Sequence, residues 1–508
     1  MHITTVKVGS INYHLKTYSL TQKTLTIMKK VITSMMALLA IVMLTASCGN
    51  DNDIAKAIPA DAPVVFKANV KSLSEKAALK DNKQLQADLQ KGMEGMSEAL
   101  KKKMKAVMDD PKESGFALQK PVFIAVTDPD KSQFVISLGV NDKDKVTELF
   151  KSTKDDCKTM KITEGEDQTV VEDQGMQVAY NSDLCVITVE RTDAATLLKQ
   201  DEDKSILSQD KYAKMLEGTS DIDAYIDYAA LMGTAQKMSN KPELAAASEL
   251  VKGLYLIANV NFEEKEAVIK AEAFGNEVLL GLTKAIENKP SGDYLKLAPA
   301  DAYGVLQCGL KNMDKIKQLL PKAETEQIDK QLQSMGISLD QLLKAIEGDV
   351  MLSVAPNGTQ QMPQISFVLA CKDQKVWEAI SKTAAPMGEG MVEKKDDNTY
   401  NLKLQAIAGM DYTLSYDKKA IVMTPVTAPA KTFKDNDNAS AVKDGGFFID
   451  IQKILGNPQV KGMAGQQATA LADLESISAT GEGNKGEYTI KFNKPGNALA
   501  TIVSMMQK

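Results

Sequence analysis

Two stretches of the sequence begin alike: PADAPVVFKANVK at residues 59–71 and PADAYGVLQCGLK at residues 299–311. After each PADA segment, apolar side chains occupy every second position. The positions that correspond are Phe66, Ala68 and Val70 with Leu306, Cys308 and Leu310. Alternation with a period of two is typical of a strand that buries one face. We therefore expect a strand after each PADA turn, with these apolar residues on its buried face.

Further matches between the two halves follow in the same order along the chain. They are GFAL (115–118) with GISL (336–339), PVFIAV (121–126) with DVMLSV (349–354), and AYIDYAALMG (224–233) with FFIDIQKILG (447–456). This self-similarity predicts a tandem duplication, with copies at 54–289 and 290–508 and a boundary turn at 289–293. Strand-like segments follow one another without a helix between them, so each copy is predicted to be α+β with a mainly antiparallel sheet and packed helices. Asn276 and Asn497 are expected to cap the closing helices 277–288 and 498–507.

The N-terminal region resembles a bacterial lipoprotein signal peptide. Met28 and two lysines precede VITSMMALLAIVML at 31–44, which is too short to span a membrane but has the length of a signal h-region. Ala46 and Ser47 lie directly before Cys48, so we expect a signal peptide over 28–47, lipid on Cys48, and a short tether over 48–53. Residues 1–27 hold three lysines and no acids and are expected to be a misannotated extension. A long natural n-region is the alternative.

Composition limits the chemistry that the protein can perform. The full chain carries a formal net charge of −6, and its first 47 residues hold five lysines and no acids, so the mature body is acidic and is not expected to bind nucleic acid. Both histidines, His2 and His14, precede the signal segment. The mature chain therefore lacks the residue needed for Ser-His and Cys-His nucleophile pairs and for histidine-rich zinc sites. Arg191 is the sole arginine, which argues against bidentate phosphate recognition.

The signal, the opening AIPADAPVVFKANVKSL at 57–73 and the strand-rich duplicated body resemble a family of uncharacterised Bacteroidetes envelope lipoproteins. The resemblance implies an outer-membrane location through lipidated Cys48 and carries over no catalytic residue. In such lipoproteins, acids just after the cysteine tend to mark export, so Asp51 and Asp53 favour the cell surface over the periplasmic face. A polar tether is the alternative interpretation, since a linker beside a lipid anchor is hydrophilic in any case.

Three motifs could carry chemistry, and each has a structural alternative. The segment GEGNKG at 481–486 fits GxGxxG, but strand-like sequence lies on both sides of it, which predicts a hairpin rather than a dinucleotide loop. Asp61 with Asp301, and Asp227 with Asp450, recur in both halves and are expected in turns and at strand ends. The run 435–438 (Asp-Asn-Asp-Asn) lacks the glycine and glutamate of a calcium loop. We predict no catalytic, metal or cofactor site.

The thiols and one methionine-rich segment raise structural questions. Cys308 and Cys371 continue apolar strand faces and are expected to be buried free thiols. Whether Cys157 and Cys185 form a disulfide is left open. One apolar helix face is predicted to pack on its own sheet, with a surface for a partner or lipid as the alternative; its residues are Leu85, Leu89, Met93, Met96, Leu100, Met104 and Val107.

These observations favour a non-catalytic binding or scaffold module on the cell envelope, with an unknown envelope protein or ligand as its partner. Two alternatives remain. A carrier of an apolar ligand would need an apolar cavity between sheet and helices. A carboxylate-dependent glycan hydrolase would need an aromatic-lined cleft, yet aromatic residues make up 5% of the chain and Trp377 is the sole tryptophan.

Overall fold

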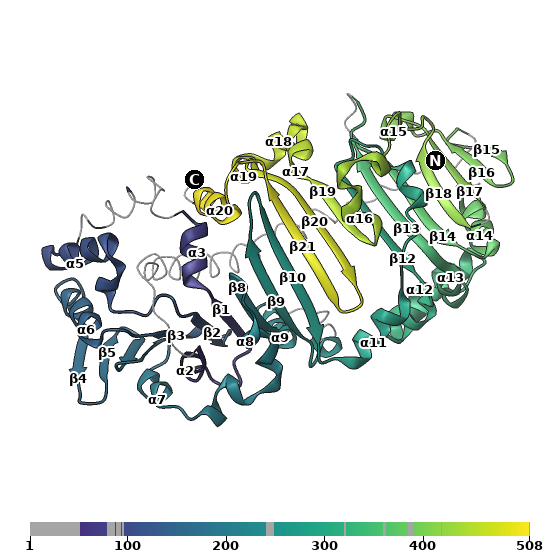
Figure 1. Ribbon diagram of the computed structural model, residues 1–508. Helices are drawn as coiled ribbons and strands as arrows, with labels where there is room; N and C mark the ends of the chain where they lie inside the picture. Colours follow the sequence, from purple (N-terminus) through teal and green to yellow (C-terminus); the bar gives the residue numbers. More distant parts are fainter. Residues whose placement is uncertain are drawn as a thin grey trace, which may run out of the picture. The chain divides into compact units, whose positions relative to one another are not determined.

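The computed structural model describes residues 51–78, 87, 93, 96–239, 248–319, 322–358, 362–384, 390–417 and 419–506 (Figure 1). The predicted extension, the signal segment and Cys48 lie outside this part of the chain. The chain divides into two compact units, residues 1–249 and 250–508, which are described separately below.

The first unit is built on one antiparallel sheet with the strand order β8-β1-β2-β3-β7-β6-β5-β4. Its strands are β1 (Val64–Ala68), β2 (Val122–Asp128), β3 (Gln133–Gly139), β4 (Lys161–Glu164), β5 (Thr169–Asp173), β6 (Met176–Tyr180), β7 (Leu184–Val189) and β8 (Ile222–Asp227). Its described helices are α2 (Asp51–Ala55), α3 (Val70–Lys76), α5 (Glu98–Asp109), η1 (Pro111–Ser114), α6 (Lys143–Ser152), α7 (Ala194–Leu198), η2 (Glu202–Lys204), η3 (Ile206–Ser208), η4 (Asp210–Tyr212), α8 (Ala213–Glu217) and α9 (Tyr228–Ser239).

The core of this unit lies between the sheet and α5 and α6. Leu100 and Met104 of α5 are buried in the same apolar cluster as Val146 of α6 and the strand residue Ile187. Helix α5 begins at Glu98 because the hydroxyl of Ser97 accepts a hydrogen bond from the backbone N–H of Leu100, an N-cap interaction. The described residues of the predicted apolar helix face therefore pack against the sheet of their own unit, and not against a partner or lipid. Leu85 and Leu89 lie outside the described residues.

The second unit contains a longer antiparallel sheet, with the order β9-β10-β21-β20-β19-β12-β13-β14-β18-β17-β16-β15 and with β11 on β12. Figure 1 shows β10 in teal beside β21 in yellow, two strands far apart in sequence. The strands are β9 (Tyr255–Phe262), β10 (Glu266–Phe274), β11 (Glu287–Asn288), β12 (Gly304–Leu310), β13 (Ile346–Ala355), β14 (Gln364–Cys371), β15 (Val392–Asp396), β16 (Thr399–Leu402), β17 (Tyr412–Tyr416), β18 (Ala420–Pro425), β19 (Gly446–Asp450), β20 (Leu474–Glu482) and β21 (Lys485–Phe492).

The described helices of the second unit are α11 (Glu277–Ile286), η5 (Asp293–Leu297), η6 (Met313–Leu319), α12 (Lys322–Ser334), α13 (Leu339–Ala345), α14 (Gln374–Ala384), α15 (Gln405–Ala408), η8 (Phe433–Asp435), η9 (Asp437–Ala439), α16 (Ser440–Lys443), α17 (Ile451–Gly456), α18 (Pro458–Ala464), α19 (Gln466–Leu471) and α20 (Ala498–Met506). Asn276 and Asn497 accept backbone hydrogen bonds at the starts of α11 and α20, which confirms the two predicted caps. The predicted α+β class with a mainly antiparallel sheet is confirmed.

The two PADA turns form the same backbone hydrogen bonds. The N–H of Ala62 donates to the carbonyl of Pro59 at 3.2 Å, and the N–H of Ala302 donates to the carbonyl of Pro299 at 3.1 Å. Beyond these turns, the order β8-β1-β2-β3-β7-β6-β5-β4 in the first unit corresponds to β19-β12-β13-β14-β18-β17-β16-β15 in the second. This correspondence supports the proposal that the chain arose by duplication.

The compact units do not divide where the sequence matches end. The segment from β9 to α11, which the sequence places in the first copy, belongs to the second unit. The reason is the ladder between β10 and β21, in which Val268 lies opposite Thr489 and Ile269 lies opposite Tyr488.

Candidate functional site

The buried face of β12 is the opposite of the one predicted from the sequence. Leu306 is 41% exposed, and Cys308 and Leu310 are half-buried, whereas Val305 and Gln307 are buried. The covered side is the one on which Leu295 of η5 and Val442 of α16 pack against Val305. The face that the sequence predicted to be buried, with Leu306, Cys308 and Leu310, is apolar but partly exposed to solvent.

This apolar face continues across the neighbouring strands. Residues directly opposite each other in an antiparallel ladder lie on the same face of the sheet, so one row can be followed from β21 to β18. It consists of Tyr488, Ala479, Phe447, Leu306, Leu352, Phe367 and Met423. Tyr488 is 44% exposed and Leu352 is 39% exposed, in the middle of a sheet where apolar side chains are ordinarily covered.

Two adjacent rows have the same character. One contains Ile490, Ile477, Ile449, Gly304, Val354 and Ile365. The other contains Cys308, Val350, Leu369 and Ile421. No side chain in the three rows carries a charge or an amide, and most are only half-buried. We call these three rows the apolar face.

Helices close this face at its β16–β18 end. Trp377 of α14 is 2% exposed and lies in one apolar cluster with Tyr400, Tyr416 and Ile421. Its ring stacks on Tyr416 with 6.0 Å between centroids, and its indole N–H donates to the carbonyl of Asp397. The exposed part of the apolar face therefore begins where this cluster ends.

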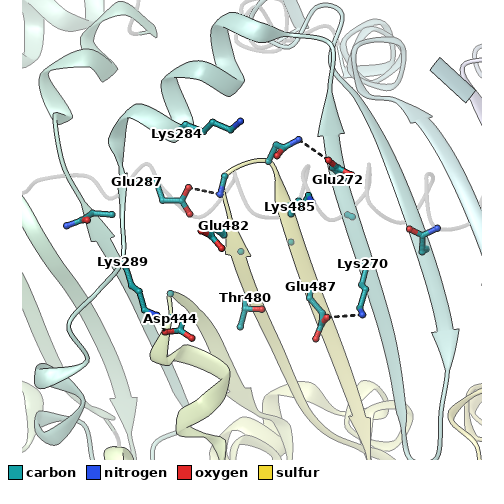
Figure 2. A pocket seen from close by; sticks show the side chains of 18 of the residues that line it. Lys270, Glu272, Lys284, Glu287, Lys289, Asp444, Thr480, Glu482, Lys485 and Glu487 are labelled. Carbon is teal, nitrogen blue, oxygen red and sulfur yellow. Dashed lines mark hydrogen bonds and ion pairs between the residues drawn. The ribbon is translucent and has the colours of Figure 1, made fainter. Parts of the chain in front are cut away.

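A charged groove lies at the tip of the β20–β21 hairpin (Figure 2). The strand side chains that line it lie on the side of the sheet opposite to the apolar face. Its volume is about 1020 Å³. The charged residues that line it are Lys270, Glu272, Lys284, Glu287, Lys289, Lys311, Asp444, Glu482, Lys485 and Glu487. The sequence motifs did not predict this groove, because its residues come from five separate segments that only the fold brings together.

The glycine motif forms one side of this groove as a hairpin. Glu482 of β20 pairs with Lys485 of β21, so Gly483 and Asn484 form a two-residue turn. Gly483 adopts a φ of +62°, a conformation that favours glycine. No helix follows the motif, because β21 continues directly, and the predicted hairpin is confirmed.

Several charges in the groove already have partners. Figure 2 shows Glu287 accepting a hydrogen bond from the backbone N–H of Gly483, at 2.6 Å. Lys289 and Asp444 form an ion pair at 2.7 Å between Nζ and Oδ1. The hydrogen bond from Lys289 lowers the pKa of Asp444, and the same contact raises the pKa of Lys289.

The recurring aspartates have local structural roles. Asp227 accepts a hydrogen bond from the N–H of Ala230 at the start of α9, and Asp450 accepts one from the N–H of Lys453 at the start of α17. Asp61 and Asp301 are exposed in the PADA turns.

The run 435–438 is likewise occupied by local hydrogen bonds, from the Thr432 hydroxyl to Asp435 and from the Asn438 N–H to Asn436. Among the described residues, no group of three or more His, Cys, Asp or Glu could hold a metal ion.

All four cysteines of the described chain are free thiols, so Cys157 and Cys185 are not bridged. Cys185 and Cys371 are buried, which confirms the expectation for Cys371. Cys308 was expected to be buried but is only half-buried, because it lies on the apolar face. Burial raises the pKa of the thiols of Cys185, Cys308 and Cys371.

The fold and the two surfaces define an α+β protein built on a long antiparallel sheet with one apolar face. The chain belongs to the family described as a domain of unknown function (DUF4836), whose model matches residues 55–485. No curated protein matches the chain. Within the part of the chain that the structure describes, no helix is both long and apolar enough to cross a membrane.

Among solved structures, the chain is similar to three crystal forms of TP0453. Form IV is 14% identical and the match covers 46% of this chain and 84% of that one, with a TM-score of 0.28. Form I is 13% identical, with 48% and 88% covered and a TM-score of 0.27. Form III is 14% identical, with 48% and 90% covered and a TM-score of 0.27.

Proposed function

We propose that this protein is held in the bacterial outer membrane by lipid on Cys48 and binds the acyl chain of a lipid-like ligand on its apolar face, without catalysing a reaction. The observation that carries the proposal is the apolar face itself. Tyr488, Leu306 and Leu352 are each 39% to 44% exposed and lie in register on neighbouring or nearby strands. A contiguous exposed apolar patch is the surface that a binding partner covers.

The chemistry of the face favours a hydrocarbon occupant. A bound extended peptide would bring backbone N–H and C=O groups against side chains that, apart from the hydroxyl of Tyr488, offer them almost no hydrogen bonds, and each unpaired group costs about 1–3 kcal/mol. An acyl chain has no such groups and gains about 25 cal/mol for each Å² of apolar surface that is removed from water. The row from Tyr488 to Phe367 crosses six strands, a length of about 24 Å at about 4.8 Å per step. This exceeds the hydrocarbon thickness of one leaflet, about 15 Å.

Two further observations support binding rather than hydrolysis. The mature chain has no histidine, and each recurring aspartate is explained by a helix cap or a turn. The location is proposed from the Ala46-Ser47-Cys48 segment, and the cell surface is favoured by Asp51 and Asp53.

The surface location has a direct test. Protease added to intact cells is expected to digest the protein, and the Asp51→Asn/Asp53→Asn variant is expected to be protected. If the wild-type protein is digested only after lysis, it faces the periplasm.

The apolar face is tested with a soluble form that begins at Gly49. The Leu306→Asn/Leu352→Asn variant is expected to bind a fluorescent fatty acid about thirtyfold more weakly, because two Leu contacts are replaced by polar groups. The Leu250→Asn/Leu471→Asn variant is the matched control, since these residues are 38% and 37% exposed and lie outside the apolar face. Equal affinities of the two variants, or a wild-type protein that binds no fatty acid, would argue against the proposal. An amphipathic helix of a partner protein would then be the occupant to test.

A further inference from the structure

We propose that the apolar face of the second unit selects one long acyl chain, of about 16 carbons or more, which lies across the strands along the row from Tyr488 to Phe367. This inference rests on the proposed function, because it names the class of acyl chain that the same face takes and the direction in which that chain lies. The row is the central one of the three: on β12, for example, Leu306 lies between Gly304 and Cys308.

The apolar face is longer across the strands than along them. From Gly304 to Cys308 it extends about 13 Å along β12, at about 3.3 Å per residue, whereas from Tyr488 to Phe367 it extends about 24 Å across the strands. A carbon–carbon bond of about 1.5 Å advances an extended chain by about 1.25 Å, so about 11 carbons cover the face along the strands and about 20 cover it across them. A long chain therefore finds apolar contacts over its whole length only when it lies across the strands.

The most exposed side chains of the face all belong to this central row. Tyr488, Leu306 and Leu352 are 44%, 41% and 39% exposed, respectively. Every residue in the two outer rows is half-buried or buried. An occupant that lies along the central row, with the outer rows on either side of it, would cover the part of the face that the protein leaves most exposed.

The corresponding row of the first unit is covered by the protein itself. It consists of Phe66, Ile124, Ile136, Ile187 and Val178, which lie opposite one another on successive strands. Ile124 is 3% exposed and Val178 is 1% exposed, in one apolar cluster with Met104 of α5 and Val146 of α6. The open row is therefore a property of the second unit, and each protein is expected to hold one acyl chain rather than two.

The direction of the chain is tested with saturated fatty acids of 10 to 18 carbons, which displace a fluorescent fatty acid from the soluble form that begins at Gly49. Affinity is expected to rise about twofold for each added CH₂, or about 250-fold over the series, because one side of the chain contacts the face. One chain is expected to bind per protein. An affinity that levels off at about 12 carbons, or two equal sites, would overturn the inference and leave acyl-chain binding standing. No binding of any fatty acid would reject both.

A variant at one end of the row distinguishes long chains from short ones. Tyr488→Asn is expected to weaken binding of the 18-carbon chain about fivefold and of the 10-carbon chain less than about twofold, because the shorter chain fits on the rest of the row. Tyr488→Phe keeps the apolar ring and is expected to bind both chains as the wild type does. Tyr228→Asn is the control, since Tyr228 is 38% exposed on α9 of the first unit. Equal weakening of both chains by Tyr488→Asn, or the same effect from Tyr228→Asn, would overturn the inference.

Discussion

Replacement of Cys48 by serine is expected to move the protein from the membrane fraction to the soluble envelope fraction. The thiol is the proposed attachment point of the lipid, and each buried CH₂ of an acyl chain contributes about 0.8 kcal/mol to membrane binding, so two chains hold a protein firmly. The measurement is fractionation of cells followed by immunoblotting, with the processed length of the chain determined by mass spectrometry.

The control for this experiment is Cys157→Ser, which removes a half-buried thiol of the folded body and is expected to leave the protein in the membrane fraction. If Cys48→Ser partitions with membranes as the wild type does, the lipid anchor on Cys48 is wrong. If both variants are lost from the membrane, the effect lies in folding.

Replacement of Trp377 by alanine is expected to have the largest effect on stability. The side chain is 2% exposed, stacks on Tyr416, and donates a hydrogen bond to the carbonyl of Asp397. Its removal leaves a cavity between α14 and the sheet, and such substitutions lower the free energy of unfolding by about 3–5 kcal/mol. Urea denaturation followed by circular dichroism measures the change.

Trp377→Phe is the matched variant, because it keeps an aromatic ring and loses the indole N–H. It is expected to lower the free energy of unfolding by about 1–2 kcal/mol. A loss below about 1 kcal/mol for Trp377→Ala would show that the helix is not packed on the sheet as described.

The sequence was sufficient to predict the fold class and several local features. Asn276 and Asn497 cap the helices that were expected after them, and the motif at 481–486 forms the expected hairpin. These features depend on neighbouring residues alone. The ordered matches between the halves also correspond to strands that pair in the same order.

The buried side of the sheet could not be predicted from the same pattern. Leu306, Cys308 and Leu310 are more apolar than Val305, Gln307 and Gly309, yet the second set is the covered one. Burial on that side depends on η5 and α16, which pack there from distant parts of the chain. Alternation identifies the two faces of a strand, but it cannot say which face another element covers. An apolar face that stays partly exposed is the departure from pattern that suggests function.

The ladder between β10 and β21 and the charged groove were equally beyond sequence reasoning. Both depend on contacts between residues that are far apart in the sequence, such as Ile269 with Tyr488 in the ladder and Lys289 with Asp444 in the groove. No local sequence motif specifies such a pair. Lysines and glutamates on a strand usually indicate a face that is exposed to solvent, so they did not point to a groove.

The most direct test of the apolar face uses the thiol that lies on it. Cys308 is half-buried and begins one row of the apolar face, and Cys157 is half-buried and belongs to the first unit, so it is not part of the face. Alkylation of both thiols by iodoacetamide is followed by mass spectrometry, with and without saturating palmitate. The account predicts that palmitate slows the alkylation of Cys308 about tenfold and leaves Cys157 unchanged, since a bound acyl chain covers the row Cys308, Val350 and Leu369. An unchanged rate at Cys308, or equal slowing of both thiols, would contradict it.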